Sequence, residues 1–189
     1  MKKLLLILLC LPLISISQDS ILISGNQVSI FQVGKKVPNI GLINEFIISK
    51  QEEMFSQEGE DYYLDVYYVQ LDSDTIISIQ SDYESKDIID QIFILSGKIR
   101  TKEGIGIGST IEDFTLKYND YSIWWTYISD MCVIDTRKYD KVQFILDVSD
   151  LKDGRPTSLY DRPYIKDLFN PLEISDFFPN TKINSIRLF

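Results

Sequence analysis

Residues 99–118 read IRTKEGIGIGSTIEDFTLKY, which predicts a strand that passes through a glycine-rich turn into a short helix. Gly104, Gly106 and Gly108 occupy every second position, so in an extended chain they would lie on one face that carries no side chains. Another element or a binding partner could approach the backbone closely there. The three glycines are therefore candidate binding-surface residues.

The residues after these glycines carry the signal for a helix start. Ser109 and Thr110 are each followed three residues later by an acidic residue, which is the spacing of a capping box. Ile111, Phe114 and Tyr118 then recur at helical spacing, which predicts one apolar face. Glycines before a helix can also cradle phosphate, but serine at position 109 breaks the dinucleotide-binding spacing and no Walker lysine follows.

The pattern around Gly108 also occurs around Gly34. In both places an aliphatic residue precedes the glycine and another follows three residues after it, and the two glycines are 74 residues apart. A duplicated α+β unit, with halves 18–101 and 102–189, would produce this spacing. Chance similarity of a short pattern is the alternative.

The segment 102–114, KEGIGIGSTIEDF, resembles the T-x-x-G-I-x-V-G-S-T-x-x-D-L segment of small exported proteins of Gram-negative bacteria. It is similar in kind to the segment that opens the helices of the outer-membrane assembly lipoprotein BamE and of β-lactamase-inhibitor-like modules. This resemblance implies a binding module in which short helices pack on an antiparallel sheet. It assigns no functional residue.

Residues 1–17 have the three parts of a secretory signal peptide: two lysines, an apolar run over 4–14, and small residues before a cleavage point near Gln18. The apolar run is too short to span a membrane, although an anchored N-terminal helix is the alternative. Leu9 precedes Cys10 where lipid attachment needs a small residue. We expect an exported chain, in the periplasm or outside the cell, with 18–189 as a single domain and no integral membrane segment after cleavage.

The charge of the chain restricts its partners. The full chain has a formal net charge of −9, and removal of the two signal lysines leaves 17 basic and 28 acidic residues, a net charge of −11. Such a surface repels nucleic acid and anionic lipid, so the expected partner is a protein or another envelope component. After cleavage Cys132 is the one remaining cysteine, which excludes an internal disulfide, and its apolar neighbours favour a buried thiol over a reactive one.

Runs of β-branched and aromatic residues separated by short polar turns predict antiparallel meanders. The predicted strands are 21–23, 28–33, 62–71, 75–80, 88–95, 98–101, 121–127, 131–135, 141–148 and 183–188. Pro38 and the apolar residues after it predict a second short helix or an irregular packed segment, and the acidic segment 52–61 a loop. The predicted fold class is therefore α+β, an antiparallel sheet with one or two short helices packed on it.

The chain contains no histidine, which excludes Ser-His-Asp and Cys-His catalysis and histidine zinc sites. Carboxylate chemistry, a serine–lysine pair or calcium remain. The acidic residues Asp147, Asp150 and Asp153 recur at every third position, whereas an EF-hand loop needs ligands at alternate positions; Asp72 and Asp74 are the second acidic group. We therefore predict no catalytic residue, no metal site and no cofactor.

Aromatic residues supply the remaining candidate surface. Trp124, Trp125 and Tyr127 lie in one predicted strand, where aromatic side chains offer large contact areas with a polar handle. Adjacent residues of a strand point to opposite faces, so one tryptophan should lie outside the core face. Aromatic residues in strands also serve simply as core, which is the alternative.

The function expected from these features is a non-enzymatic envelope binding or assembly module. One alternative is a small carboxylate-dependent hydrolase of envelope polysaccharide, which would need two carboxyl groups held roughly 5 to 10 Å apart. A further alternative is an inhibitor or immunity protein whose acidic face meets a basic enzyme.

Overall fold

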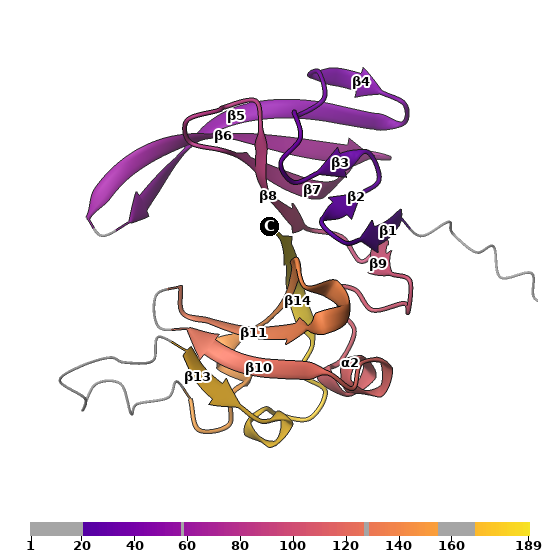
Figure 1. Cartoon of the computed structure of the whole chain (residues 1–189), viewed down its shortest axis with the longest axis vertical. Coiled ribbons are helices and arrows are strands. Elements are labelled where there is room, and N and C mark those ends of the chain that lie inside the picture. Colours follow the sequence, from indigo (N-terminus) through magenta and orange to yellow (C-terminus); the bar gives the residue numbers. More distant parts are fainter. Residues whose placement is uncertain (1–20, 58, 127–128, 155–168) are drawn as a thin grey trace, which may run out of the picture.

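The computed structural model describes residues 21–57, 59–126, 129–154 and 169–189; the expected signal peptide lies outside these ranges. Ten of the described strands form one curved antiparallel sheet, in the order β13-β10-β11-β12-β14-β8-β7-β6-β5-β4 (Figure 1). The strands of this large sheet are β4 Gly41–Ile43, β5 Phe46–Gln57, β6 Glu60–Leu71, β7 Asp74–Ser81, β8 Ile89–Ile94, β10 Tyr121–Thr126, β11 Met131–Thr136, β12 Val142–Leu146, β13 Phe169–Leu172 and β14 Ile183–Leu188.

A small sheet is built from the N-terminal strands and β9, in the order β3-β2-β1-β9. Its strands are β1 Ile21–Ser24, β2 Gln27–Val28, β3 Phe31–Gln32 and β9 Ile99–Thr101, and β1 pairs with β9 in parallel. Among the described residues, the helical elements are α2 Ile111–Lys117 and the 3-10 turns Arg137–Tyr139, Val148–Asp150 and Ile174–Asp176. The predicted antiparallel sheet with a short helix packed on it is confirmed.

The core lies between the large sheet and the layer formed by α2 and the small sheet. Phe114 of α2 packs edge-on against Phe144 of β12, with ring centroids 4.9 Å apart, and both side chains are fully buried. On the small sheet, Phe31 packs against Phe46 of β5 at 5.7 Å. Burying an apolar side chain of this size stabilises a fold by about 1.5–3 kcal/mol, so these contacts hold the two layers together.

Helix α2 begins where the sequence predicts. The Thr110 side chain accepts a hydrogen bond from the backbone N–H of Asp113 at 3.0 Å, and the Asp113 carboxylate accepts one from the backbone N–H of Thr110 at 3.1 Å. This is a complete capping box, which satisfies two backbone donors that have no partner within the helix.

The backbone pairing around Gly34 recurs around Gly108. The Gly34 N–H donates to Ile89 O and the Ile89 N–H to Lys35 O; in the same way the Gly108 N–H donates to Ile183 O and the Ile183 N–H to Ser109 O. Each glycine turn thus pairs with the first residue of a later strand of its own half, β8 in the first half and β14 in the second. The central strands β8 and β14 then pair with each other. This correspondence supports the hypothesis of a duplicated unit, which stays a prediction.

Two local predictions are wrong. Residues 41–43 form β4, which pairs with the start of β5, instead of a second helix after Pro38. The acidic segment 52–61 is part of a continuous hairpin, in which β5 and β6 pair from Ile47–Gln70 to Gln57–Glu60. Backbone pairing with the neighbouring strand compensates for the weak strand propensity of the acidic residues. None of the described helices is long and apolar enough to cross a membrane.

Candidate functional site

The glycine-rich segment forms a tight turn, not an extended strip. Gly104 and Gly108 have φ angles of 86° and 84°, a region that glycine adopts readily and other residues rarely do. At Gly106 an added Cβ would lie 2.8 Å from both the Ile99 carbonyl oxygen and Arg100 Cγ. The close approach expected at these glycines therefore occurs within the chain, at Gly106, and comes from β9.

A half-buried carboxylate holds this turn to the helical layer. Glu103 accepts hydrogen bonds from the Tyr118 and Tyr139 hydroxyls, each at 2.9 Å, and forms an ion pair with Lys138 Nζ at 2.6 Å. Burial acts to raise the pKa of Glu103, but the bonds from Lys138, Tyr118 and Tyr139 outweigh it and lower the pKa from 4.5 to about 2. The Glu103 carboxylate is thus ionised, and it already accepts bonds from Tyr118, Tyr139 and Lys138, which indicates a role in stability.

The two tryptophans of β10 point to opposite sides of the large sheet. Trp125 is 2% exposed and lies in the core, where its Nε1–H donates to Asp130 at 3.2 Å. Trp124 is half-buried on the other side. Of this pair, Trp124 is the residue with an accessible part of its ring. Tyr127 lies outside the described residues.

Trp124 begins a polar network that crosses four strands. Its Nε1–H donates to Asp135 of β11, which also accepts a hydrogen bond from Gln143 of β12. Arg187 of β14 donates through Nε to Gln143 Oε1 at 3.0 Å, and also through Nη2. Burial raises the pKa of Asp135 and lowers that of Arg187. The four side chains therefore hold one another in a fixed arrangement.

The same row continues across the centre of the sheet. Arg187 lies directly opposite Phe93 of β8, Phe93 opposite Ser78 of β7, and Ser78 opposite Tyr68 of β6. Directly opposed residues point to the same side of a sheet. We call the residues that share this side of the sheet the Trp124 face: Trp124, Asp135, Gln143, Arg187, Phe93, Ser78 and Tyr68. In Figure 1, α2 and the small sheet lie on the other side of the large sheet.

Two shallow pockets adjoin this face. One, of about 420 Å³, is lined by Ser122, Ile123, Trp124, Asp135 and Pro171. The other, of about 590 Å³, brings Asp135 together with Asp120, Tyr121, Ser122, Thr136 and Arg137. Within it, Asp120 accepts a hydrogen bond from the Thr136 hydroxyl at 2.8 Å. The second pocket thus contains two carboxylates, those of Asp120 and Asp135.

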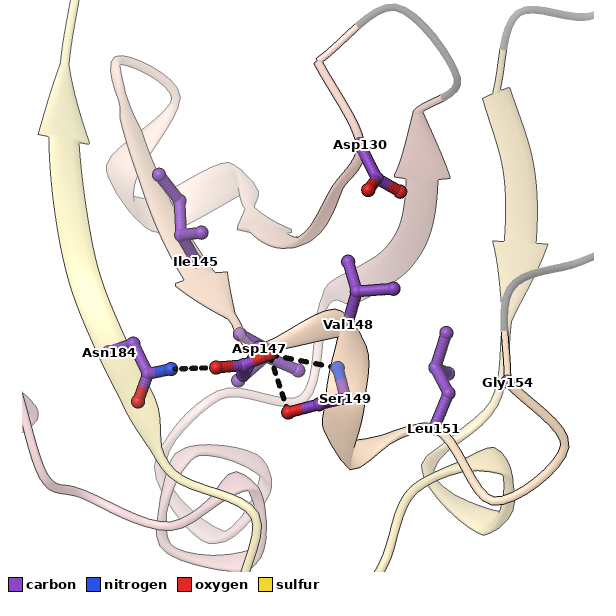
Figure 2. A pocket seen from close by; sticks show the side chains of 9 residues that line it. Asp130, Ile145, Asp147, Val148, Ser149, Leu151, Gly154 and Asn184 are labelled. Carbon is purple, nitrogen blue, oxygen red and sulfur yellow. Dashed lines mark hydrogen bonds between the residues drawn. The ribbon is translucent and has the colours of Figure 1, made fainter.

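A third pocket, of about 490 Å³, lies beside the acidic residues considered for calcium (Figure 2). Asp147 turns toward Ser149 and Asn184, accepting bonds from the Ser149 N–H at 2.8 Å, the Ser149 hydroxyl at 2.7 Å and Asn184 Nδ2 at 3.3 Å. These bonds lower the pKa of Asp147. Its carboxylate therefore serves to cap the 3-10 turn Val148–Asp150.

The remaining acidic and cysteine candidates lie in surroundings that give them a structural role. The described residues contain no group of three or more acidic or cysteine side chains placed to hold a metal ion. Asp72 and Asp74 lie at the β6–β7 turn, where Asp74 pairs with Lys98 at 2.9 Å. Cys132 is fully buried, and burial raises its thiol pKa to about 12, so the thiol is unreactive in the folded chain.

Sequence reasoning missed Asp135, Gln143 and Arg187. Gln143 and Arg187 each lie between apolar residues of a strand, and Asp135 lies between Ile134 and Thr136, so alternation alone would place them on the face opposite the core. The strand pattern of the sequence therefore indicates that these three side chains face away from the core. Their assembly into one network depends on the pairing of β12 with β14, whose residues are about forty positions apart in the chain.

No protein-family model matches this chain, and no curated protein matches it in sequence. The crystal structure of the uncharacterized protein yfeY from Escherichia coli is similar to it, with a TM-score of 0.43 and 14% sequence identity over 74% of this chain and 80% of that chain. This chain therefore resembles an uncharacterised bacterial protein. The finer resemblance to envelope-assembly and inhibitor modules stays a prediction.

Proposed function

We propose that the chain is an exported, non-enzymatic binding module that holds a protein or another envelope component against the Trp124 face. The observation that carries this proposal is the row of aromatic and polar side chains across seven strands, all half-buried except the buried Gln143, on the side of the sheet away from α2. Protein-binding surfaces are enriched in tryptophan, tyrosine, phenylalanine and arginine, and this row combines all four.

The rigidity of the network supports the same function. Asp135, Gln143 and Arg187 are held by mutual hydrogen bonds on three strands, and Trp124 is tied to Asp135. Side chains that are already ordered lose little conformational entropy when a partner binds. The signal-like N-terminus supports export.

The test is native mass spectrometry of the chain isolated gently from its own envelope fraction, with Trp124→Ala compared with wild type. Truncating a large aromatic side chain of the contact surface should weaken retention of the bound component about tenfold or more. Leu116→Ala is the matched control, because Leu116 is 80% exposed on α2, on the other side of the sheet. Equal retention by Trp124→Ala and wild type would contradict the proposed face.

A carboxylate-dependent hydrolase is the second candidate, favoured by the pocket that contains Asp120 and Asp135. The raised pKa of Asp135 is a property of catalytic acids, although buried structural carboxylates share it. This function predicts turnover of an envelope glycan with a bell-shaped pH profile, and loss of that turnover in Asp135→Asn. No turnover across a glycan panel would reject it and leave the binding module.

A further inference from the structure

The hairpin of β5 and β6 extends beyond its neighbour in the sheet. Both strands have 12 residues, and the last pair between β6 and β7 joins Val66 to Gln80. Residues 60–65 continue past this pair and lie beside β5 alone among the described strands. At about 3.3 Å per residue, roughly 20 Å of strand edge is open to another chain on the β7 side. Figure 1 shows this part of the hairpin as an arm.

A groove of about 790 Å³ runs along this edge. One wall is β6 itself, and the other is formed by the end of β7, the loop after it and the start of β8. The lining residues are Glu60, Asp61, Tyr62, Leu64, Gln80, Ser81, Asp82, Tyr83, Asp90 and Gln91. The Tyr62 ring stacks on Phe55 at 5.9 Å and meets Tyr83 edge-on at 6.4 Å, so aromatic contact area lies beside the open edge.

The groove is acidic. Glu60, Asp61, Asp82 and Asp90 line it, and no lysine or arginine does so. The described ion pairs of the chain involve other carboxylates, among them Asp87 with Lys36 and Glu52 with Lys86. Ser81 also lines the groove, is 1% exposed, and has a buried hydroxyl without a hydrogen-bond partner among the described residues. The site therefore offers uncompensated negative charge and an unsatisfied hydroxyl.

The loop that forms the second wall is held in place by hydrogen bonds. Asp82 Oδ1 accepts from the backbone N–H groups of Glu84 and Ser85 at 3.0 and 2.7 Å. The Tyr67 hydroxyl donates to the Lys86 carbonyl at 3.1 Å. A partner can thus bind in the groove without first ordering this wall, which reduces the entropic cost of binding.

We propose that this groove binds an extended, basic segment of a partner protein, which adds to the large sheet as a strand beside residues 60–65. Backbone hydrogen bonds to the open edge supply the affinity, and alternate side chains reach the four carboxylates and the Tyr62–Tyr83 pair. A second copy of this chain fits poorly, because the same acidic edge would face itself. The inference does not depend on the Trp124 face: that face reaches β6 and β7 at Tyr68 and Ser78, but none of its residues lines the groove.

The experiment uses the full chain and a synthetic peptide of about eight residues that alternates lysine and valine, long enough to cover the edge. Binding is followed by fluorescence anisotropy, and the site by amide hydrogen exchange. We expect saturable binding that weakens with added salt, together with new protection of the amides in 60–65. A matched peptide that alternates glutamate and valine should not bind. A lysine–valine peptide N-methylated at alternate residues on its pairing edge should bind about tenfold more weakly or worse, because it cannot complete the backbone ladder.

Charge variants locate the site. Replacing Glu60, Asp61 and Asp90 by Gln, Asn and Asn should reduce affinity for the lysine–valine peptide about tenfold at low salt, since three exposed ion pairs are lost. The control changes three exposed carboxylates away from the groove by the same substitutions, at Glu45, Glu112 and Asp140. Equal affinities of the two variants would overturn the proposal.

Three other results would also overturn it: no saturable binding of the lysine–valine peptide, unchanged affinity after N-methylation, or protection confined to amides outside 60–65. A dimer of the chain, detected by sedimentation and protected at the same amides without peptide, would assign the edge to a second copy instead. Retention of an envelope partner by the Trp124 face is measured separately, so failure of one proposal leaves the other standing.

Discussion

Glu103→Gln tests the role of the half-buried carboxylate that joins the glycine-rich turn to Tyr118, Tyr139 and Lys138. The Glu103 side chain is 17% exposed, so its interactions are only partly screened by solvent. A pKa of about 2 instead of 4.5 corresponds to about 3 kcal/mol of stabilisation of the ionised form. Glutamine keeps an acceptor for the tyrosines but loses the charge. We therefore expect the variant to lose about 2 kcal/mol of unfolding free energy at neutral pH.

The stabilisation by Glu103 should depend on pH. The folded-state pKa of Glu103 is depressed, so its contribution is complete above the unfolded pKa of 4.5 and is lost as the pH falls toward about 2. The stability difference between wild type and Glu103→Gln should therefore be constant near neutral pH, shrink below about pH 4.5, and vanish near pH 2.

The assay is urea denaturation followed by tryptophan fluorescence over this pH range, with equal slopes required for the two proteins. Glu45→Gln is the control, because Glu45 is exposed in the turn between β4 and β5. The reasoning is refuted if Glu103→Gln is as stable as wild type at neutral pH. It is also refuted if the stability difference persists unchanged below the folded pKa.

Three further predictions concern single residues. Gly106→Ala should lower the unfolding free energy by about 1–3 kcal/mol, because the added Cβ meets the backbone oxygen of Ile99; thermal denaturation measures this, and an unchanged midpoint would contradict the close contact. Thr110→Ala should cost about 1 kcal/mol by removing the cap of α2, whereas Thr110→Ser should cost less, as judged by urea midpoints. The Cys132 thiol should react with a thiol reagent at mildly alkaline pH only as fast as the chain opens, so rapid labelling of the folded protein would show that the thiol is not buried.

Local signals predicted the helix start well and the hairpin arm poorly. The capping box at Thr110 and Asp113 involves atoms three residues apart, so its pattern is visible in the chain itself. The acidic segment 52–61 has the composition of a loop, yet it forms strands because β5 and β6 pair along their whole length. The segment after Pro38 has apolar residues that suit a helix or a strand. It forms a strand because its backbone pairs with β5.

The candidate sites depend on strand pairing and strand length in the folded sheet. Alternation along β10 predicted that Trp124 and Trp125 point to opposite faces, and the structure places Trp125 in the core. Alternation along the strand could not show which of the two tryptophans is buried. The network of Trp124, Asp135 and Arg187 needs the pairing of β12 with β14, which are far apart in the chain. The groove combines the consecutive strands β6, β7 and β8, and it depends on how far β6 runs past the end of β7.

By itself the sequence determined the strand-rich character of the chain, the capped helix and the absence of histidine chemistry, because these follow from residue type and from spacings of two to four positions. Only the tertiary structure decided that β8 pairs with β14 at the centre of the sheet, that β1 joins β9 in parallel, and that β6 runs past the end of β7. Such pairings join distant parts of the chain, and burial of the whole core selects among them. The Trp124 face and the acidic groove are consequences of that selection.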